Sequence, residues 1–280
     1  MIIQSDWHIH SQYSYDASNP LDEIGSKAKD QGLVGVGITD HVNFNDEKFI
    51  TDLKNSAKGV TKAQKQYPFM VLGVELTPIA LPEFEHIAKT KTREGYVPPL
   101  QSSPYGIELA LSKQELIDLG VRYAIGAAHW RVDCPPSSGM DCDLQACLKE
   151  WHRLQLWLAC DERVTILGHP WYHGKGLWYE DFSIIPKSMN NEISSALKAN
   201  GKCVECNSHF FTTKKTSEKF RNQYAEFLRS LFEMGIPITY GSDSHHNYGD
   251  LRERVENYLG KAGFVNGDFT EISDTLMFKR

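Results

Sequence analysis

Short apolar runs alternate with helix-length stretches along most of this 280-residue chain, and this alternation constrains the fold more than any other feature. Seven runs rich in β-branched and aromatic residues are found, near Ile2–Trp7, Leu33–Thr39, Phe69–Val74, Tyr123–Ala128, Val164–Leu167, Lys202–Cys206 and Pro237–Gly241. Strand-like runs separated by helix-length segments predict repeated β-α units and a parallel sheet. We therefore expect an α/β protein.

Polar residues follow the ends of all seven runs. They are His8 and His10, His41, Glu75, His129, His169, Asn207, and Asp243 with His245. The ends of the strands converge on one mouth in a (β/α) barrel, whereas an open doubly wound sheet would spread these residues along a line. We therefore predict a distorted seven-stranded (β/α)7 TIM-like barrel, formed as a single domain by residues 1–280.

Signals for helices lie between the runs. In the first predicted helix Asn19 can act as the N-cap, Pro20 suits the first turn, and Gly32 can end the helix. Further helices are predicted at 47–66, 144–160, 188–200, 217–234 and 250–259. The segment of about residues 76–112 contains five prolines, and we expect it to be an irregular, lid-like insertion over the mouth.

The sequence His8-Ile9-His10 can bind one metal ion through both imidazoles, because positions two apart in a strand share a face. Such a pair alone is weak evidence. However, six of the eleven histidines follow predicted strands, together with Glu75 and Asp243. Burying so many ionisable groups without a metal would be costly, so the pattern predicts a metal site.

The motifs DWHIHSQYSYD, ITDH, GVE, AAH, GHP, ECN and GSDSH occur in this order. Together they resemble the motif series of the PHP (polymerase and histidinol phosphatase) family, from Asp6 to about His245. The resemblance implies a seven-stranded distorted barrel that holds up to three metal ions. It also implies a metal-dependent phosphoesterase.

The resemblance assigns a ligand set to each ion. The first set is His8, His10, Glu75 and Asp243; the second is Glu75, His129 and His169; the third is Asp16, His41 and His245. Asp16 stands where some family members have histidine, which could change the metal preference there. Catalytic roles are expected for Glu75, Asp243 and His245.

Barrel hydrolases of the amidohydrolase type are an alternative, because they too begin with HxH and end with an aspartate. Their sites usually use a lysine or a carbamylated lysine from a central strand. This chain has His129 where such a lysine would stand, and its TDH and DSH motifs favour the PHP assignment.

Two to three divalent ions beside three carboxylates would leave the site positively charged, which suits a phosphate dianion. We expect a metal-activated hydroxide to attack the phosphorus directly, without a phosphoenzyme. Imidazole and carboxylate ligands suit zinc, manganese or iron.

Several further residues are candidates for contacting the substrate, on weaker sequence evidence than the metal ligands. Arg131 and Lys175 can bind a phosphate, although each can equally be a solvent-exposed charged residue in a loop. Asn207 resembles the asparagine of the family's EIN motif. His173, His209 and His246 are candidate proton donors, although each can also be an ordinary loop histidine. Six aromatic residues could stack on a leaving group or simply line the core: Trp130, Trp171, Tyr172, Trp178, Phe210 and Phe211.

The net charge of −6 argues against extensive electrostatic binding of long nucleic acid. We predict no membrane span and no signal peptide, and expect a cytoplasmic protein.

The leading hypothesis is a phosphomonoesterase acting on a small phosphorylated metabolite, similar to histidinol-phosphate phosphatase. The alternatives are a nucleotide phosphatase or 5′–3′ exonuclease of the same family, and a metal-binding domain without catalysis.

Overall fold

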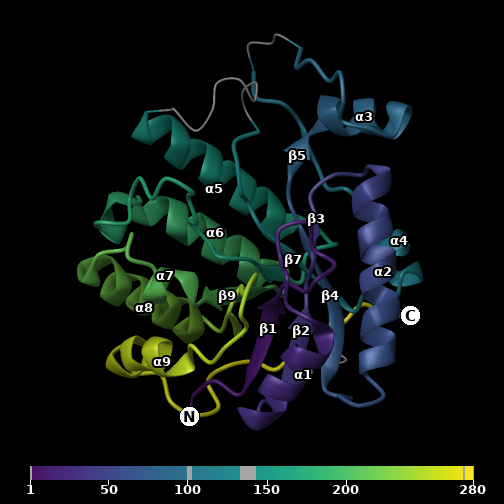
Figure 1. The fold of residues 1–280 in the computed structure, drawn as a ribbon. Coiled ribbons are helices and arrows are strands. Elements are labelled where there is room, and N and C mark those ends of the chain that lie inside the picture. Colours follow the sequence, from purple (N-terminus) through teal and green to yellow (C-terminus); the bar gives the residue numbers. More distant parts are fainter. Residues whose placement is uncertain (1, 100–102, 133–142, 274, 280) are drawn as a thin grey trace.

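The computed structural model describes residues 2–99, 103–132, 143–273 and 275–279 (Figure 1). Its strands are β1 (Ser5–Ile9), β2 (Gly35–Ile38), β3 (His41–Val42), β4 (Met70–Leu76), β5 (Ile79–Ala80), β6 (Ile107–Glu108), β7 (Tyr123–Gly126), β8 (Ile166–Leu167), β9 (Cys203–Asn207) and β10 (Ile238–Gly241). Its α-helices are α1 (Leu21–Asp30), α2 (Glu47–Ala63), α3 (Leu81–Thr90), α4 (Lys113–Asp118), α5 (Leu144–Cys160), α6 (Lys187–Ala199), α7 (His209–Thr212), α8 (Glu218–Glu233) and α9 (Arg252–Lys261).

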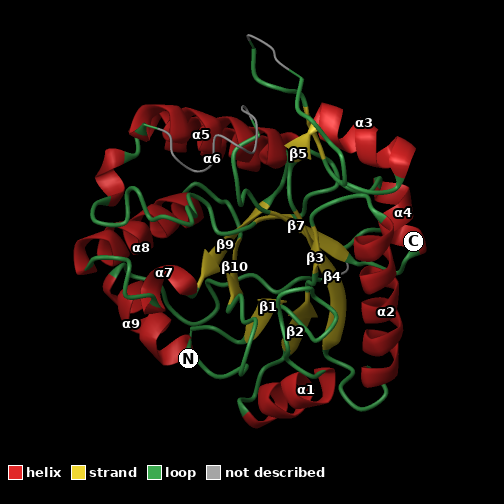
Figure 2. Cartoon of the chain, turned by 45° about the horizontal axis from the view of Figure 1, so that its top comes forward, coloured by secondary structure: helices red, strands yellow, loops and turns green. Residues whose placement is uncertain are grey.

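Seven parallel strands form a nearly closed barrel in the order β1-β2-β4-β7-β8-β9-β10, and this confirms the predicted fold class. The short strand β3 follows β2 and also pairs with β4. Backbone contacts between β1 and the end of β10 close the ring: His10 N–H donates to Ser244 O, and Asp243 N–H donates to His8 O. Figure 2 shows the strands as an inner ring and the helices outside it.

Each of the seven predicted strands is present, with bounds shifted by a few residues. The first begins three residues later than expected, so His8 lies inside β1. The predicted cap of α1 is wrong, because Pro20 takes the N-cap position without a side-chain hydrogen bond. Asn19 instead donates to the carbonyls of His10 and Ser244 and therefore connects the segments that follow β1 and β10.

The segment following β4 is more regular than predicted. It contains helix α3 and a small antiparallel pair formed by β5 and β6. In Figure 1, α3 and β5 lie beyond the end of the barrel toward which the β1 arrow points. Residues 100–102 of the segment lie outside the described residues.

Apolar side chains fill the barrel near the amino ends of its strands. Trp7 and Tyr123 pack edge to face, and the Tyr123 hydroxyl donates to Trp7 O. A Cβ added at Gly37 would lie only 1.7 Å from the Tyr123 oxygen, so glycine is required for this packing. Ile272, from the C-terminal segment, belongs to the same cluster. The barrel interior is therefore a packed apolar core at this end.

Candidate metal centre

All nine predicted metal ligands gather at the carboxyl ends of the strands. They come from seven places in the chain: His8 from β1 with His10 directly after it, Asp16 from the following loop, His41 from β3, Glu75 from β4, His129 and His169 after β7 and β8, and Asp243 and His245 after β10. Because parallel strands end at the same edge of a barrel, residues distant in sequence meet there.

Glu75 lies at the centre of the cluster and is fully buried. Five imidazoles face its carboxylate oxygens at 3.0–3.3 Å: His8, His10 and His41 face Oε2, and His129 and His169 face Oε1. The arrangement allows Glu75 to contact more than one ion.

The first predicted ligand set is brought together around the end of β1. The Nε2 atoms of His8 and His10 are 3.1 Å apart. Asp243 Oδ1 is 3.2 Å from His10 Nε2 and 3.6 Å from His8 Nε2. Asp243 has a left-handed backbone (φ 53°), which turns the chain sharply at the end of β10.

The second set surrounds the other oxygen of Glu75. The rings of His129 and His169 have centroids 5.0 Å apart, and both present Nε2 to Glu75 Oε1. His41 also belongs here, because His41, Glu75 and His129 offer ligand atoms within 4.8 Å of one another.

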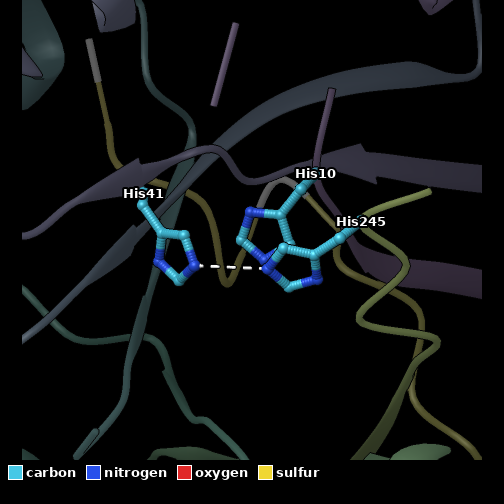
Figure 3. Close-up of side chains that lie close together, drawn as sticks. All are labelled: His10, His41 and His245. Atoms are coloured by element: carbon cyan, nitrogen blue, oxygen red, sulfur yellow. Dashed lines mark hydrogen bonds between the residues drawn. The ribbon is translucent and has the colours of Figure 1, made fainter. Parts of the chain in front are cut away.

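The third set lies at the more exposed edge of the cluster. Asp16 Oδ2 is 3.4 Å from His41 Nε2 and 3.5 Å from His245 Nε2, and these two nitrogens are 3.4 Å apart. Figure 3 shows the ring of His10 beside those of His41 and His245. His10, His41 and His245 also form a group with ligand atoms within 4.8 Å.

The electrostatics of the cluster favour positive charge. Burial would raise the pKa of Glu75, but the imidazoles of His8 and His41 hold it well below its usual range. Burial opposes charge on His41, yet Glu75 and Asp16 raise the pKa of His41 to about 10. Burial lowers the pKa of His129 to about 4. A proton is therefore drawn onto His41, which faces two carboxylates, but not onto His129, and the site beside Glu75 and Asp16 would stabilise a cation.

The residues present fit divalent metal ions. Within the described part of the chain, the buried atoms Glu75 Oε2 and His41 Nδ1 have no hydrogen-bond partner, although they lie 3.0 Å apart. Unpaired buried polar atoms are costly, and a shared cation would satisfy both of these. A mixed imidazole and carboxylate donor set suits zinc, manganese or iron.

Two residues that support the ligands were not predicted. Glu205 in β9 contacts both His8 and the backbone of His169. Its position could have been read from the ECN motif, since Glu205 and Asn207 share one face of a strand. Thr77 lies 2.9 Å from His129 Nδ1 and donates to Asn43. It stands outside every motif, so the sequence gives no signal for it.

The predicted substrate-binding residues occupy different surroundings. Asn207 donates to Asp243 Oδ2 at 3.2 Å and accepts from the backbone N–H of His209, so both residues border the cluster. Arg131 follows His129 closely, and the backbone N–H of Lys175 donates to His173. A contact of any of them with substrate stays a prediction.

Four of the six aromatic residues line the core, which is one of the two alternatives that the sequence left open. Trp171, Trp178, Phe210 and Phe211 are buried core residues. Tyr172 is half-buried, and its ring lies 5.0 Å from that of His169. Trp130 is also half-buried, with its ring 6.0 Å from that of His129. Only these two of the six remain beside the ligands.

Known proteins resemble the chain in fold and in sequence. A crystal structure of histidinol phosphate phosphatase from Lactococcus lactis subsp. lactis, complexed with zinc, L-histidinol and phosphate, superposes with a TM-score of 0.69, 20% identity and complete coverage of both chains. A probable phosphatase from Acetivibrio thermocellus is 40% identical over 57 residues. That match covers 20% of this chain and 22% of the relative, so only about a fifth of the curated relative is represented.

In the described residues, no helix is long and apolar enough to cross a membrane.

The model of the PHP domain family matches residues 6–209, which include most of the chain and seven of the nine predicted ligands. Asp243 and His245 lie beyond the matched range, but the barrel brings them to the same cluster. The chain belongs to the PHP domain family.

Proposed function

We propose that this protein is a metal-dependent phosphomonoesterase acting on a small phosphorylated metabolite. The observation that carries the proposal is the convergence of six imidazoles and three carboxylates at the mouth of a PHP barrel. The fold shared with a histidinol phosphate phosphatase supports this reaction class. A histidinol-phosphate-like metabolite is the substrate that we propose first.

In this proposal the nine clustered residues hold two to three ions in the three ligand sets. Divalent zinc, manganese or iron would supply Lewis acidity, which acidifies water and neutralises charge on a phosphoryl group. Glu75 holds two ligand sets together, and Asp243 and His245 join the first set to the third. These three residues are the proposed catalytic residues.

The chain's other residues would bind and orient the substrate. Asn207 fixes Asp243 and leaves the His209 ring at the border of the cluster, 5.6 Å from that of Tyr172. His209 is therefore the proposed proton donor to the leaving oxygen. Arg131 and Lys175 are proposed to neutralise the phosphate from loops at the same mouth.

The insertion of about residues 76–112 is proposed to select the leaving group. Arg93, from this segment, lies over the Phe44 ring at 4.7 Å. Phe44 stacks on Trp130 with centroids 5.8 Å apart, and Trp130 adjoins His129. The insertion is thus connected to the ligand cluster by packed side chains.

The test combines elemental analysis of the purified protein with a phosphatase screen. We expect two to three ions per chain and turnover of one class among histidinol phosphate, sugar phosphates and nucleotides. Preference for diesters or oligonucleotide ends would instead support the exonuclease alternative. No bound metal after reloading with manganese, iron or zinc would overturn the proposal. Trapping a covalent phosphoryl-protein would overturn direct attack on phosphorus.

A further inference from the structure

Glu205 is a buried carboxylate that contacts two proposed metal ligands, one in β1 and one in the loop after β8. Its Oε1 atom is 2.6 Å from Nδ1 of His8, which belongs to the first ligand set. Its Oε2 atom accepts the backbone N–H of His169, which belongs to the second set. Glu205 itself is only 1% exposed and lies on β9.

These contacts fix which nitrogen of His8 can bind a metal. Facing a carboxylate, Nδ1 carries the proton, and the lone pair of Nε2 then points toward Glu75 and Asp243. A carboxylate behind a ligating imidazole also raises its basicity and holds its orientation.

The contact with His169 holds a strained segment of backbone. His169 has φ 23°, which is unusual for a residue other than glycine. Such a conformation persists only where the surroundings enforce it. The hydrogen bond from its N–H to Glu205 supplies such a restraint, and it directs the His169 ring toward Glu75 Oε1 at 3.0 Å.

A carboxylate is the side chain that suits both contacts. Each partner is a donor, so both oxygens of Glu205 must accept. Glutamine has nearly the same shape but only one acceptor oxygen, and its NH2 group would face either His8 Nδ1 or the His169 N–H. One of the two ligands would then lose its orientation.

Gly241, at the end of β10, provides the space for this arrangement. A Cβ added there would lie 2.0 Å from Glu205 Oε1 and 2.6 Å from the Cβ of His8. Both contacts are far below van der Waals distance, so any larger residue would displace one of these side chains.

We propose that Glu205 is a positioning residue that orients His8 and His169 together and thereby couples the first ion site to the second. This inference rests on the proposed metal centre. Its consequence is that one substitution outside the ligand set weakens two ion sites at once.

The experiment compares Glu205→Gln with Gly241→Ala, and uses Glu271→Gln as the matched control. Glu271 accepts from Ser5 near the amino ends of the strands, away from the cluster. Ion content is measured by elemental analysis after dialysis against a graded metal buffer. The visible spectrum of the cobalt-substituted proteins reports ligand geometry independently of activity.

We expect both Glu205→Gln and Gly241→Ala to bind metal about 10- to 100-fold more weakly, with altered cobalt spectra, because outer partners of ligands have effects of this size. Glu271→Gln should match the wild type. Wild-type ion content and spectrum in folded Glu205→Gln would overturn the inference. If Glu205→Gln does not fold, the same result in Gly241→Ala would overturn it. A wild type without metal would refute the proposed function itself.

Discussion

The two ends of the barrel bury charge in opposite ways. At the carboxyl ends of the strands, imidazoles crowd around Glu75, and two of the facing atoms have no hydrogen-bond partner within the described chain. At the amino ends, each buried cation has suitable acceptors. Lys202 Nζ donates to the carbonyls of Asp161 and Val164, and Arg252 donates to Ile3 O and to Asp250.

The comparison teaches that burial alone does not identify a functional site. Lys202 and Arg252 are 8% and 3% exposed, yet their hydrogen bonds complete the structure. Glu75 is equally buried, but protonated His169 and His41 would repel a proton on the neighbouring His129. An end whose side chains fit a cation is thus distinguished from an end whose buried charges are already hydrogen-bonded, and the two should respond differently to substitution.

The largest effect is expected for Glu75→Gln. The amide removes the negative charge that all five facing imidazoles share and cannot bridge two cations as a carboxylate does. Loss of at least one ion per chain and of all measurable phosphatase activity is expected, from elemental analysis and turnover assays. Glu271→Gln, at the amino end, should retain both; full activity and unchanged metal content in Glu75→Gln would refute the assignment.

Removal of metal should destabilise the wild type. Each ion present at about 100 times its Kd contributes about 2.7 kcal/mol to the free energy of unfolding. For a chain of this size the loss of each such ion on chelation corresponds to a fall in Tm of about 5–10 °C. Differential scanning calorimetry of Glu75→Gln should show a much smaller fall. An equal fall in both proteins would show that the stabilising ion binds elsewhere.

A smaller effect is expected for Asp16→Ala, because Asp16 contacts only the outer set. Its side chain is 30% exposed and faces His41 and His245. One ion should be lost while the inner ions remain, and kcat/KM should fall by about 100-fold, since one Lewis-acidic ion is worth several kcal/mol. Asp16→His is the matched variant, because it keeps a ligand atom at this position. Loss of all ions from Asp16→Ala would contradict the separation of the sets.

The seven strands and eight of the nine gathered residues were predictable because both depend on local signals, whereas Asp16 was implied by the family resemblance alone. Apolar runs mark the strands, and the residue following a parallel strand must lie at the mouth. His129 and His169 illustrate this, since each follows a strand that was correctly placed. The resemblance to the PHP motif series also grouped the predicted ligands into three sets, which no local signal in the sequence provides.

The supporting residues were not predictable because their roles depend on three-dimensional contacts. Asn19 looks like a helix cap in sequence, but its amide joins the loops following β1 and β10. Thr77 acquires its role only where it meets His129. Likewise, nothing local distinguishes buried Trp171 from half-buried Tyr172, which is its neighbour in the chain.

The smallest effect is expected at the amino ends of the strands, for Asp161→Asn. The Asp161 carboxylate accepts from the backbone N–H and the guanidinium of Arg163 at 2.7–2.8 Å. Burial would raise the pKa of Asp161, but Arg163 lowers it below the ordinary value. Because the folded pKa is lowered, the carboxylate stabilises the fold above its unfolded pKa of about 3.9, and this contribution is lost as the pH falls below that value.

Asp161→Asn should therefore lower the free energy of unfolding by about 1 kcal/mol at pH 7, the size of a typical net hydrogen bond. The difference from the wild type should shrink as the pH falls below about 4. Urea unfolding of both proteins in chelator measures this without interference from bound ions. Metal content and turnover at pH 7 should be unchanged, because the substitution lies at the end of the barrel that needs no cation. Loss of metal from this variant would show that the two ends are coupled through the packed interior and that the contrast between them is not functional.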